Sequence, residues 1–325
     1  MVLIDSFGRP LLNLRVAITR KCNLHCSYCH REGEESNQRE NTVEMTVDEI
    51  VRIVRVAVGL GISKVKLTGG EPLMRKDVVE IVKGIASLYG LKDLSMTTNG
   101  TLLASLANDL RASGLMRVNI NLLTVKGEVY NKLTGGRLED VLGGVKAAVD
   151  VGFYPVKLNM LVLKDVNDDA VPEMMEFARV SETILQLIEL EPINISNDYY
   201  RTYHKPLDDY ENMLRQRAVR VETRHRMQNR PIYHLPDSKV EVVHPIENTA
   251  FCTHCTKLRV TSDGKLKPCL MRNDNLVDIL AYLRKGASDI ELIELFKLAN
   301  RKREPYNKVH ACMPSSMSEK QIARA

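Results

Sequence analysis

The feature that most constrains this fold is a regular alternation of short apolar segments and amphipathic segments between residues 13 and about 195. Six segments are rich in β-branched and aliphatic residues and have the length of strands. They span residues 14–19, 64–68, 93–98, 117–123, 155–163 and 184–190. Helical patterns lie between them, most clearly over residues 46–61, 77–90 and 138–152. In the first of these helices, Thr46 and Glu49 have the spacing of a capping box.

Strands that alternate with helices of this length predict a parallel sheet made of βαβ units. Six units fall short of the eight that close a full (β/α)8 barrel. We therefore expect an α/β fold, with a partial, open (β/α)6 TIM-type barrel over residues 1–195. A doubly wound sheet has the same alternation and stays open as an alternative.

The alternation stops near residue 195, where a polar segment rich in tyrosine and charge begins. Two short strand candidates follow at residues 230–235 and 239–244, before a second group of cysteines. We expect a C-terminal α+β domain over residues 196–300. Residues 301–325 are polar and predict a flexible tail.

Six of the seven cysteines form two groups of three. The first cysteine trio, Cys22, Cys26 and Cys29, follows the first predicted strand with C-x3-C-x2-C spacing. Loops after strand ends face the active site in parallel α/β folds. The second cysteine trio is Cys252, Cys255 and Cys269. The seventh cysteine, Cys312, is expected to be a thiol without a ligand role.

Each trio is one ligand short of a closed four-ligand zinc site or of the four thiolates that usually hold an iron–sulfur cluster. A metal group held by three thiolates keeps one position open for another molecule. His30 and His254 could each complete a Cys3His zinc site, although a histidine adjacent to a ligand cysteine is poorly placed to fold back onto the same ion. The spacing favours a cluster in the first trio and leaves a zinc ribbon and a cluster equally open in the second.

Composition argues against a surface that binds nucleic acid. The chain has 325 residues, 46 of them basic and 41 acidic, and only 5% are aromatic with no tryptophan. That aromatic content is low for a protein that stacks bases. We see no signal peptide and no apolar run of about 18 residues, so we expect a cytoplasmic protein that binds neither membrane nor nucleic acid. In a reducing compartment, clustered cysteines more often bind metal than form disulfides.

C-x3-C-x2-C after a first strand resembles the radical S-adenosylmethionine (SAM) enzymes. Tyr28 matches the aromatic residue usual between the last two cysteines, and Gly69-Gly70-Glu71-Pro72 resembles the segment that lines the methionine end of SAM. The resemblance implies a [4Fe–4S] cluster on the first trio whose open iron binds SAM. Consecutive glycines also let a backbone approach a neighbouring group closely.

The stretch "CTHCTKLRVTSDGKLKPCL" at residues 252–270 narrows the resemblance to the GTP 3′,8-cyclases of molybdenum cofactor biosynthesis, since "LTGGEPLMRKD" and "TTNG" occur in that family's order. The resemblance implies a lyase that converts GTP to (8S)-3′,8-cyclo-7,8-dihydroguanosine 5′-triphosphate. It also implies a second [4Fe–4S] cluster, on the second trio, which binds the guanine end of GTP. Two alternatives remain: a radical SAM enzyme with an auxiliary cluster that modifies a peptide, and a zinc-ribbon protein that binds nucleic acid.

The resemblance assigns further site residues. The implied SAM contacts are Tyr28, Gly70, Asn121 and Glu191. The implied GTP contacts are Arg15, Lys66, Thr97, Lys157, Lys257 and Arg259. Several positions depart from the family pattern. Lys66 and Lys257 occupy positions where the family often has arginine, and Asn121 occupies one where it usually has serine. Gln186 and Glu191 replace an arginine and a methionine that are common in the family. The chain also ends Ala323-Arg324-Ala325, where family members often end in two glycines.

The basic residues within the predicted strands support an anionic ligand independently of the resemblance. Arg15, Lys66 and Lys157 alternate with apolar neighbours, so they can point into a barrel. Several inward cations are costly unless an anion meets them, and a triphosphate is such an anion. The partners implied by the resemblance are GTP, an electron donor, a downstream cyclic pyranopterin monophosphate synthase and a second copy of the chain in a homodimer.

Overall fold

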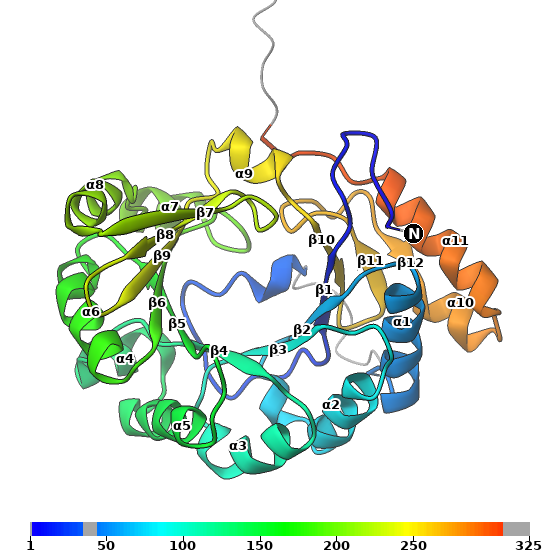
Figure 1. Ribbon diagram of the computed structural model, residues 1–325, viewed down its shortest axis with the longest axis horizontal. Coiled ribbons are helices and arrows are strands. Elements are labelled where there is room, and N and C mark those ends of the chain that lie inside the picture. Colours follow the sequence, from blue (N-terminus) through cyan, green and yellow to red (C-terminus); the bar gives the residue numbers. More distant parts are fainter. Residues whose placement is uncertain (1, 35–43, 308–325) are drawn as a thin grey trace, which may run out of the picture.

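The computed structural model describes residues 2–34 and 44–307, and its centre is one curved sheet of twelve strands. The strands lie in the order β12-β11-β10-β1-β2-β3-β4-β5-β6-β9-β8-β7, and the sheet does not close on itself (Figure 1). The six predicted strands form its parallel middle. They are β1 (Asn13–Ala17), β2 (Lys64–Thr68), β3 (Asp93–Thr98), β4 (Arg117–Asn121), β5 (Lys157–Val162) and β6 (Ile184–Glu189).

Helices follow the strands of this middle region and cover the outside of the curved sheet (Figure 1). They are α1 (Val47–Gly59), α2 (Val78–Ala86), α3 (Leu103–Ala112), α4 (Gly127–Thr134), α5 (Leu138–Asp150) and α6 (Val171–Val180), with short 3-10 helices η1 (Arg31–Gly33), η2 (Pro72–Met74) and η3 (Asp168–Ala170). The capping box forms as expected: the Thr46 hydroxyl accepts the Glu49 N–H, and the Glu49 carboxylate accepts the Thr46 N–H.

The order of the strands decides between the two predicted architectures. A doubly wound sheet reverses its strand order at a switch point and places helices on both faces. Here β1 to β6 lie side by side in chain order, with every neighbouring pair parallel. The partial, open barrel is therefore confirmed.

The chain after residue 195 adds strands to both edges of this barrel. On one side, β9 (Lys239–Val243) lies parallel to β6, followed by β8 (Arg230–His234) and β7 (Arg220–Arg224). On the other side, β10 (Lys257–Val260) lies parallel to β1, followed by β11 (Lys265–Lys267) and β12 (Val277–Asp278). The helices of this part are α7 (Asn197–Tyr203), α8 (Asp208–Arg217), α9 (Thr249–Thr253), α10 (Leu280–Arg284) and α11 (Asp289–Arg301). The sheet is thus continuous across residue 195, and the domain boundary there stays a prediction.

The tail predicted over residues 301–325 begins at Arg301, the last residue of α11, and the next residue, Lys302, is the C-terminal cap of that helix. Residues 308–325 lie outside the described residues, and with them Cys312 and the last three residues. Among the helices that the structure describes, none combines the length and the apolar character needed to cross a lipid bilayer.

Strand alternation separates the apolar core from the lumen of the barrel. Val16 on β1 and Leu67 on β2 are buried in the main core cluster with residues of the outer helices. Arg15 and Lys66, one position earlier on each strand, line the interior cavity instead. Because successive side chains of a strand point to opposite faces, the apolar residues pack outward and the polar residues face inward.

Candidate active site

One interior cavity of about 340 Å³ gathers the residues predicted from the sequence. Both cysteine trios line it, as do all the SAM and GTP contacts that the resemblance implies. Its volume is that of a pocket for a small molecule. The curved sheet therefore brings together segments as distant in sequence as Arg15 and Cys269.

The first cysteine trio lies in the loop that follows β1, and neutral backbone donors hold this loop. The Gly70 N–H donates to the carbonyl of Thr19 at 2.8 Å, and the Glu71 N–H donates to the carbonyl of Lys21 at 2.7 Å. A Cβ atom on Gly70 would lie 2.2 Å from the Lys21 carbonyl oxygen, and Gly69 has a φ of +150°. The two glycines are thus required by close packing against the cysteine loop, in addition to the expected approach to a ligand.

Glu71 connects the Gly-Gly segment to the end of β3. Its buried carboxylate accepts the Thr98 hydroxyl at 2.7 Å and the Asn99 N–H at 2.6 Å. Burial raises the pKa of Glu71 to about 6, although these hydrogen bonds favour the charged form. The neighbouring Thr97 lines the cavity, and its buried hydroxyl has no hydrogen-bond partner in residues 2–34 and 44–307. A buried, unpaired polar group beside a cavity is a position where a ligand can complete the bonding.

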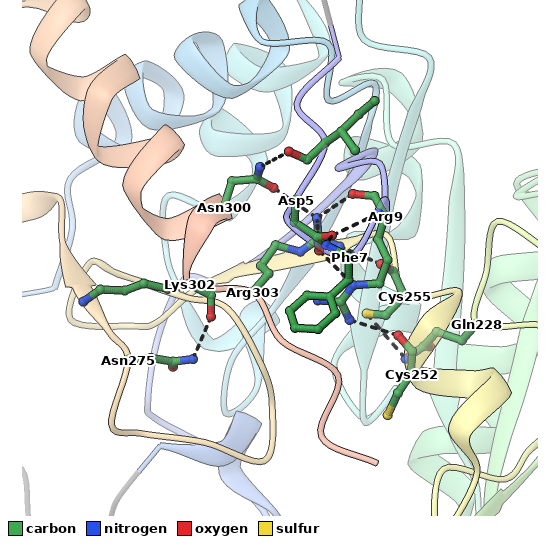
Figure 2. A network of polar contacts seen from close by, with 11 residues as sticks. Asp5, Phe7, Arg9, Gln228, Cys252, Cys255, Asn275, Asn300, Lys302 and Arg303 are labelled. Carbon is green, nitrogen blue, oxygen red and sulfur yellow. Dashed lines mark hydrogen bonds and ion pairs between the residues drawn. The ribbon is translucent and has the colours of Figure 1, made fainter. Parts of the chain in front are cut away.

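Cys252 and Cys255 of the second cysteine trio lie at the C-terminal end of α9 (Figure 2). The third member, Cys269, follows β11. Burial raises the pKa of Cys252 and of Cys269. For Cys255, burial acts in the same direction, but the positive charges of Lys257 and Arg303 outweigh it and lower the pKa. Cations beside a thiol favour the thiolate, the form in which cysteine binds metal.

The six cysteines of the two trios are free thiols. Burial also raises the pKa of Cys22 and Cys29, and that of Cys26 to about 11. Within the described ranges, no group of three His, Cys, Asp or Glu side chains is placed to hold a single metal ion. Three free thiols on one loop, facing a cavity, are nevertheless a donor set that fits an iron–sulfur cluster with one open iron. Their role as cluster ligands stays a prediction.

A row of basic residues crosses the barrel wall. Arg259 on β10 pairs in register with Arg15 on β1, which pairs with Lys66 on β2. Two residues earlier on β10, Lys257 is in register with Asn13 on β1. Because residues opposite each other on neighbouring strands point to the same face, these cations line one patch of the cavity.

Glu32 balances two of these cations. Arg259 Nη1 lies 2.6 Å and Arg15 Nη1 3.5 Å from its Oε2 atom, and Thr68 donates to Oε1 at 2.8 Å. Burial alone would raise the pKa of Glu32, but the two guanidiniums lower it to about 2. This carboxylate on η1 thereby joins the loop of the first trio to the strand that follows Cys255.

Two cavity lysines have only neutral partners. Lys66 Nζ donates to Asn119 Oδ1 at 2.7 Å, and Lys257 Nζ donates to Gln228 Oε1. Within the described part of the chain, neither forms an ion pair with a carboxylate. Burial and nearby cations lower the pKa of both lysines well below the ordinary range. Lys157 differs, because it forms an ion pair with buried Glu241.

The SAM contacts implied by the resemblance lie near a ladder of side-chain amides. Asn121 Oδ1 accepts a hydrogen bond from Asn159 at 2.9 Å, and Asn159 Oδ1 accepts from Gln186 at 3.1 Å and from Asn119 at 3.2 Å. Tyr28 packs against a small apolar cluster that contains Leu190. Gly70 and Glu191 line the same cavity.

The sequence reasoning missed several cavity residues. Asn119 and Asn159 line the cavity, and their alternation with apolar residues on β4 and β5 could have identified them. Arg230 also lines it, with a buried Nε atom that has no hydrogen-bond partner in the described residues. His204 and His244, which carry no sequence pattern, contact the buried cavity residue Glu189 at 2.8 and 3.3 Å.

Comparisons with known proteins agree with this geometry. The family model described as "Radical SAM superfamily" matches residues 16–178 of this chain. The family model described as "Molybdenum Cofactor Synthesis C" matches residues 183–309. Among solved structures, Streptococcus suis SuiB bound to S-adenosylmethionine superposes with a TM-score of 0.61 at 18% identity, covering 87% of this chain and 64% of that one. Native anSMEcpe with bound AdoMet has a TM-score of 0.59 at 18% identity, over 88% and 81% of the two chains. The fold is thus that of the radical SAM structures.

Proteins with much higher identity narrow the class. A protein of Pyrococcus horikoshii named probable GTP 3′,8-cyclase is 51% identical over 94% of this chain and 98% of its own length. A protein of the same name from Methanocaldococcus jannaschii is 45% identical over 94% and 99%. This chain belongs to the GTP 3′,8-cyclase family of radical SAM enzymes.

Proposed function

We propose that this enzyme converts GTP to (8S)-3′,8-cyclo-7,8-dihydroguanosine 5′-triphosphate, the first step of molybdenum cofactor biosynthesis. The observation that carries the proposal is the single cavity onto which both cysteine trios open, with a row of basic residues in its wall. A molecule bound at the first trio and a second molecule bound at the other trio would therefore share this cavity.

In this proposal, the first trio holds a [4Fe–4S] cluster. When bound, that cluster supplies the electron that cleaves SAM and produces a 5′-deoxyadenosyl radical able to remove the 3′-hydrogen of GTP. The chain positions SAM through the amide of Asn121, the backbone at Gly70, the ring of Tyr28 and the carboxylate of Glu191.

The basic row holds the triphosphate. Arg15 and Arg259 present guanidiniums that are oriented by Glu32, while Lys66 and Lys257 supply ammonium groups without a carboxylate partner in the described residues. An anion is the missing counter-charge for these two lysines. Thr97 offers its unpaired hydroxyl, and Lys157, which is paired with Glu241, completes the GTP contacts.

The second trio holds a second [4Fe–4S] cluster whose open iron binds the guanine end of GTP. Support comes from its three free thiols in the cavity wall and from the charges that lower the pKa of Cys255. With the guanine held there and the triphosphate on the basic row, C3′ and C8 of the substrate lie within the cavity between the two trios.

The remaining partners follow from the chemistry. An electron donor must reduce the first cluster, and a cyclic pyranopterin monophosphate synthase must consume the product. The proposal also includes a homodimer and a cytoplasmic location, where thiols stay reduced.

The test is anaerobic turnover of the reconstituted enzyme with SAM, GTP and dithionite, followed by mass spectrometry of the products. When GTP is present, we expect equal amounts of 5′-deoxyadenosine and of the cyclised nucleotide, above a small background of SAM cleavage that does not need GTP. Formation of 5′-deoxyadenosine only with a peptide, and no cyclised nucleotide, would instead identify a peptide-modifying enzyme.

A further inference from the structure

Two buried arginines hold the turn between Cys252 and Cys255 (Figure 2). Arg9 Nη1 donates to the carbonyl oxygen of Cys252 at 2.9 Å, and Arg303 Nη2 donates to the carbonyl oxygen of Cys255 at 2.6 Å. The exposed fractions of the two arginines are only 5% and 1%. One lies near the start of the described chain and the other just after α11, so the fold brings them together for this turn.

Asp5 fixes both arginines at once. Its Oδ2 atom accepts Arg9 Nε at 2.8 Å and forms an ion pair with Arg303 Nη1 at 3.3 Å. Its Oδ1 atom accepts the backbone N–H groups of Phe7 and Arg9, each at 3.0 Å. Arg303 Nη1 also donates to Asn300 Oδ1 at 3.1 Å. Neither guanidinium can therefore move without breaking several buried contacts.

Two further carbonyls at the turn are also held. His254 O accepts the Gln228 N–H at 3.2 Å, and Thr256 O accepts the N–H groups of Leu12 and Asn13, each at 3.0 Å. Groups outside the turn thus hold four of its backbone carbonyls, those of Cys252, His254, Cys255 and Thr256. Such supporting contacts normally orient metal ligands and tune the metal.

The charges of Asp5, Arg9 and Arg303 do not sum to zero. Two buried guanidiniums share one carboxylate, and a buried charge without a counter-charge is costly. Thiolate ligands on Cys252 and Cys255 would supply negative charge beside the two arginines.

We propose that Asp5, Arg9 and Arg303 form a charged clamp that positions the Cys252–Cys255 turn and stabilises the cluster bound there. The inference rests on the second cluster of the proposed function. Arg303 is a positioning residue: it donates to the backbone carbonyl of the proposed ligand residue Cys255. Its loss should therefore affect the second cluster and leave the first one unchanged.

The experiment uses the full chain with Cys22, Cys26 and Cys29 replaced by alanine, so that all bound iron reports on the second trio. After anaerobic reconstitution, the rate of iron release to a chelator and the midpoint potential of the cluster are measured with and without Arg303→Gln. We expect release to become about tenfold faster and the midpoint to become more negative, because a nearby positive charge stabilises the reduced cluster. Arg303→Lys keeps the charge and should restore the midpoint, with release at an intermediate rate.

A matched control separates the clamp from general destabilisation. Arg75 is also buried, pairs with Asp77 and donates to two carbonyls, those of Ile18 at 2.7 Å and Met45 at 2.9 Å. Arg75→Gln should lower the stability of the fold but leave iron release from the second trio unchanged. If Arg303→Gln does not fold, Arg9→Gln provides the same test at Cys252.

Two results would overturn the proposed clamp. One is a folded Arg303→Gln variant that releases iron as slowly as the chain without this substitution. The other is an equal acceleration of iron release by Arg75→Gln. Failure of the proposed function looks different. In that case the chain with Cys22, Cys26 and Cys29 replaced by alanine binds no iron even when Arg303 is present. The clamp is then overturned together with the second cluster.

Discussion

The two cysteine loops are held by different contacts. The loop of the first trio is fixed by backbone N–H donors from Gly70 and Glu71 and by close packing on two glycines. The turn of the second trio also accepts backbone N–H groups, but two of its carbonyls accept the buried guanidiniums of Arg9 and Arg303. Buried positive charge on the carbonyls of the turn therefore distinguishes the second site from the first.

This difference agrees with the ligands that we propose for the two ends of the cavity. SAM carries a positively charged sulfonium, and the neighbourhood of Cys22 contains the carboxylate of Glu71 and backbone dipoles. GTP carries a triphosphate, and the strand after Cys255 presents Lys257 and Arg259. Opposite local charge can thus direct two ligands to their own ends of one cavity.

The largest expected effect comes from removing one ligand from each trio. Cys22→Ala should abolish 5′-deoxyadenosine formation, because the first cluster would lose its anchor. Cys255→Ala should abolish the cyclised nucleotide but leave SAM cleavage by dithionite measurable. Mass spectrometry of both products checks the pair. Identical loss of both products in the two variants would show that the trios do not have separate roles.

A smaller but still severe effect is expected from Gly70→Ala. The new Cβ would meet the carbonyls of Arg20 and Lys21 at 2.5 and 2.2 Å, so the loop of the first trio must shift. Overpacking of this kind costs about 1–3 kcal/mol, and total iron should fall by roughly half as the first cluster is lost. Gly143→Ala is the matched control, since an added Cβ there meets nothing within 4 Å. Full iron content in Gly70→Ala would refute the role of close packing.

The cavity lysines test the positive charge that the proposed triphosphate would meet. Lys66→Met should weaken GTP binding by about 1.5–3 kcal/mol, roughly tenfold to a hundredfold in Kd, and should raise the stability of the unliganded chain. Lys157→Met should weaken binding as well but lower that stability, because it removes the partner of buried Glu241. Calorimetric titration with GTP and thermal unfolding measure the two effects. Stability changes of the same sign in both variants would contradict the distinction.

The smallest effect concerns Glu32, which links the two regions. Its pKa of about 2 lies below the ordinary 4.5, so the charged form stabilises the fold above about pH 4.5. That contribution is lost as the pH falls from about 4.5 towards 2. Glu32→Gln should flatten this part of the stability profile of the cluster-free chain, measured by urea unfolding at pH 5 and pH 3. Glu176→Gln, at an exposed ion pair with Arg179, should leave the profile nearly unchanged.

Local pattern was sufficient to predict the six parallel strands, but the choice of a barrel over a doubly wound sheet needed the strand order. Each of the six strands predicted by periodicity is present, since alternation of apolar and polar residues records which face of a strand packs on helices. Lys66 and Lys157 could be placed in the cavity because their strand neighbours are apolar. What periodicity could not give is register, which brings Arg259, Arg15 and Lys66 into one row.

The pairing of strands that are far apart in the sequence could not be predicted from the sequence. Nothing in β9 or β10 indicates that they extend opposite edges of the same sheet, because parallel pairing depends on connections elsewhere in the chain. The same is true of the clamp. Asp5 and Arg303 are ordinary charged residues in the sequence, and only the fold buries them beside Cys255.

The most direct test of the central claim, that each trio holds an iron–sulfur cluster beside one cavity, is metal analysis of the anaerobically purified chain. Iron, acid-labile sulfide and zinc are measured on the same sample. The prediction is about eight iron atoms and eight sulfides per chain, four of each for every cluster, with no zinc above background. About two zinc ions per chain with no sulfide would contradict it.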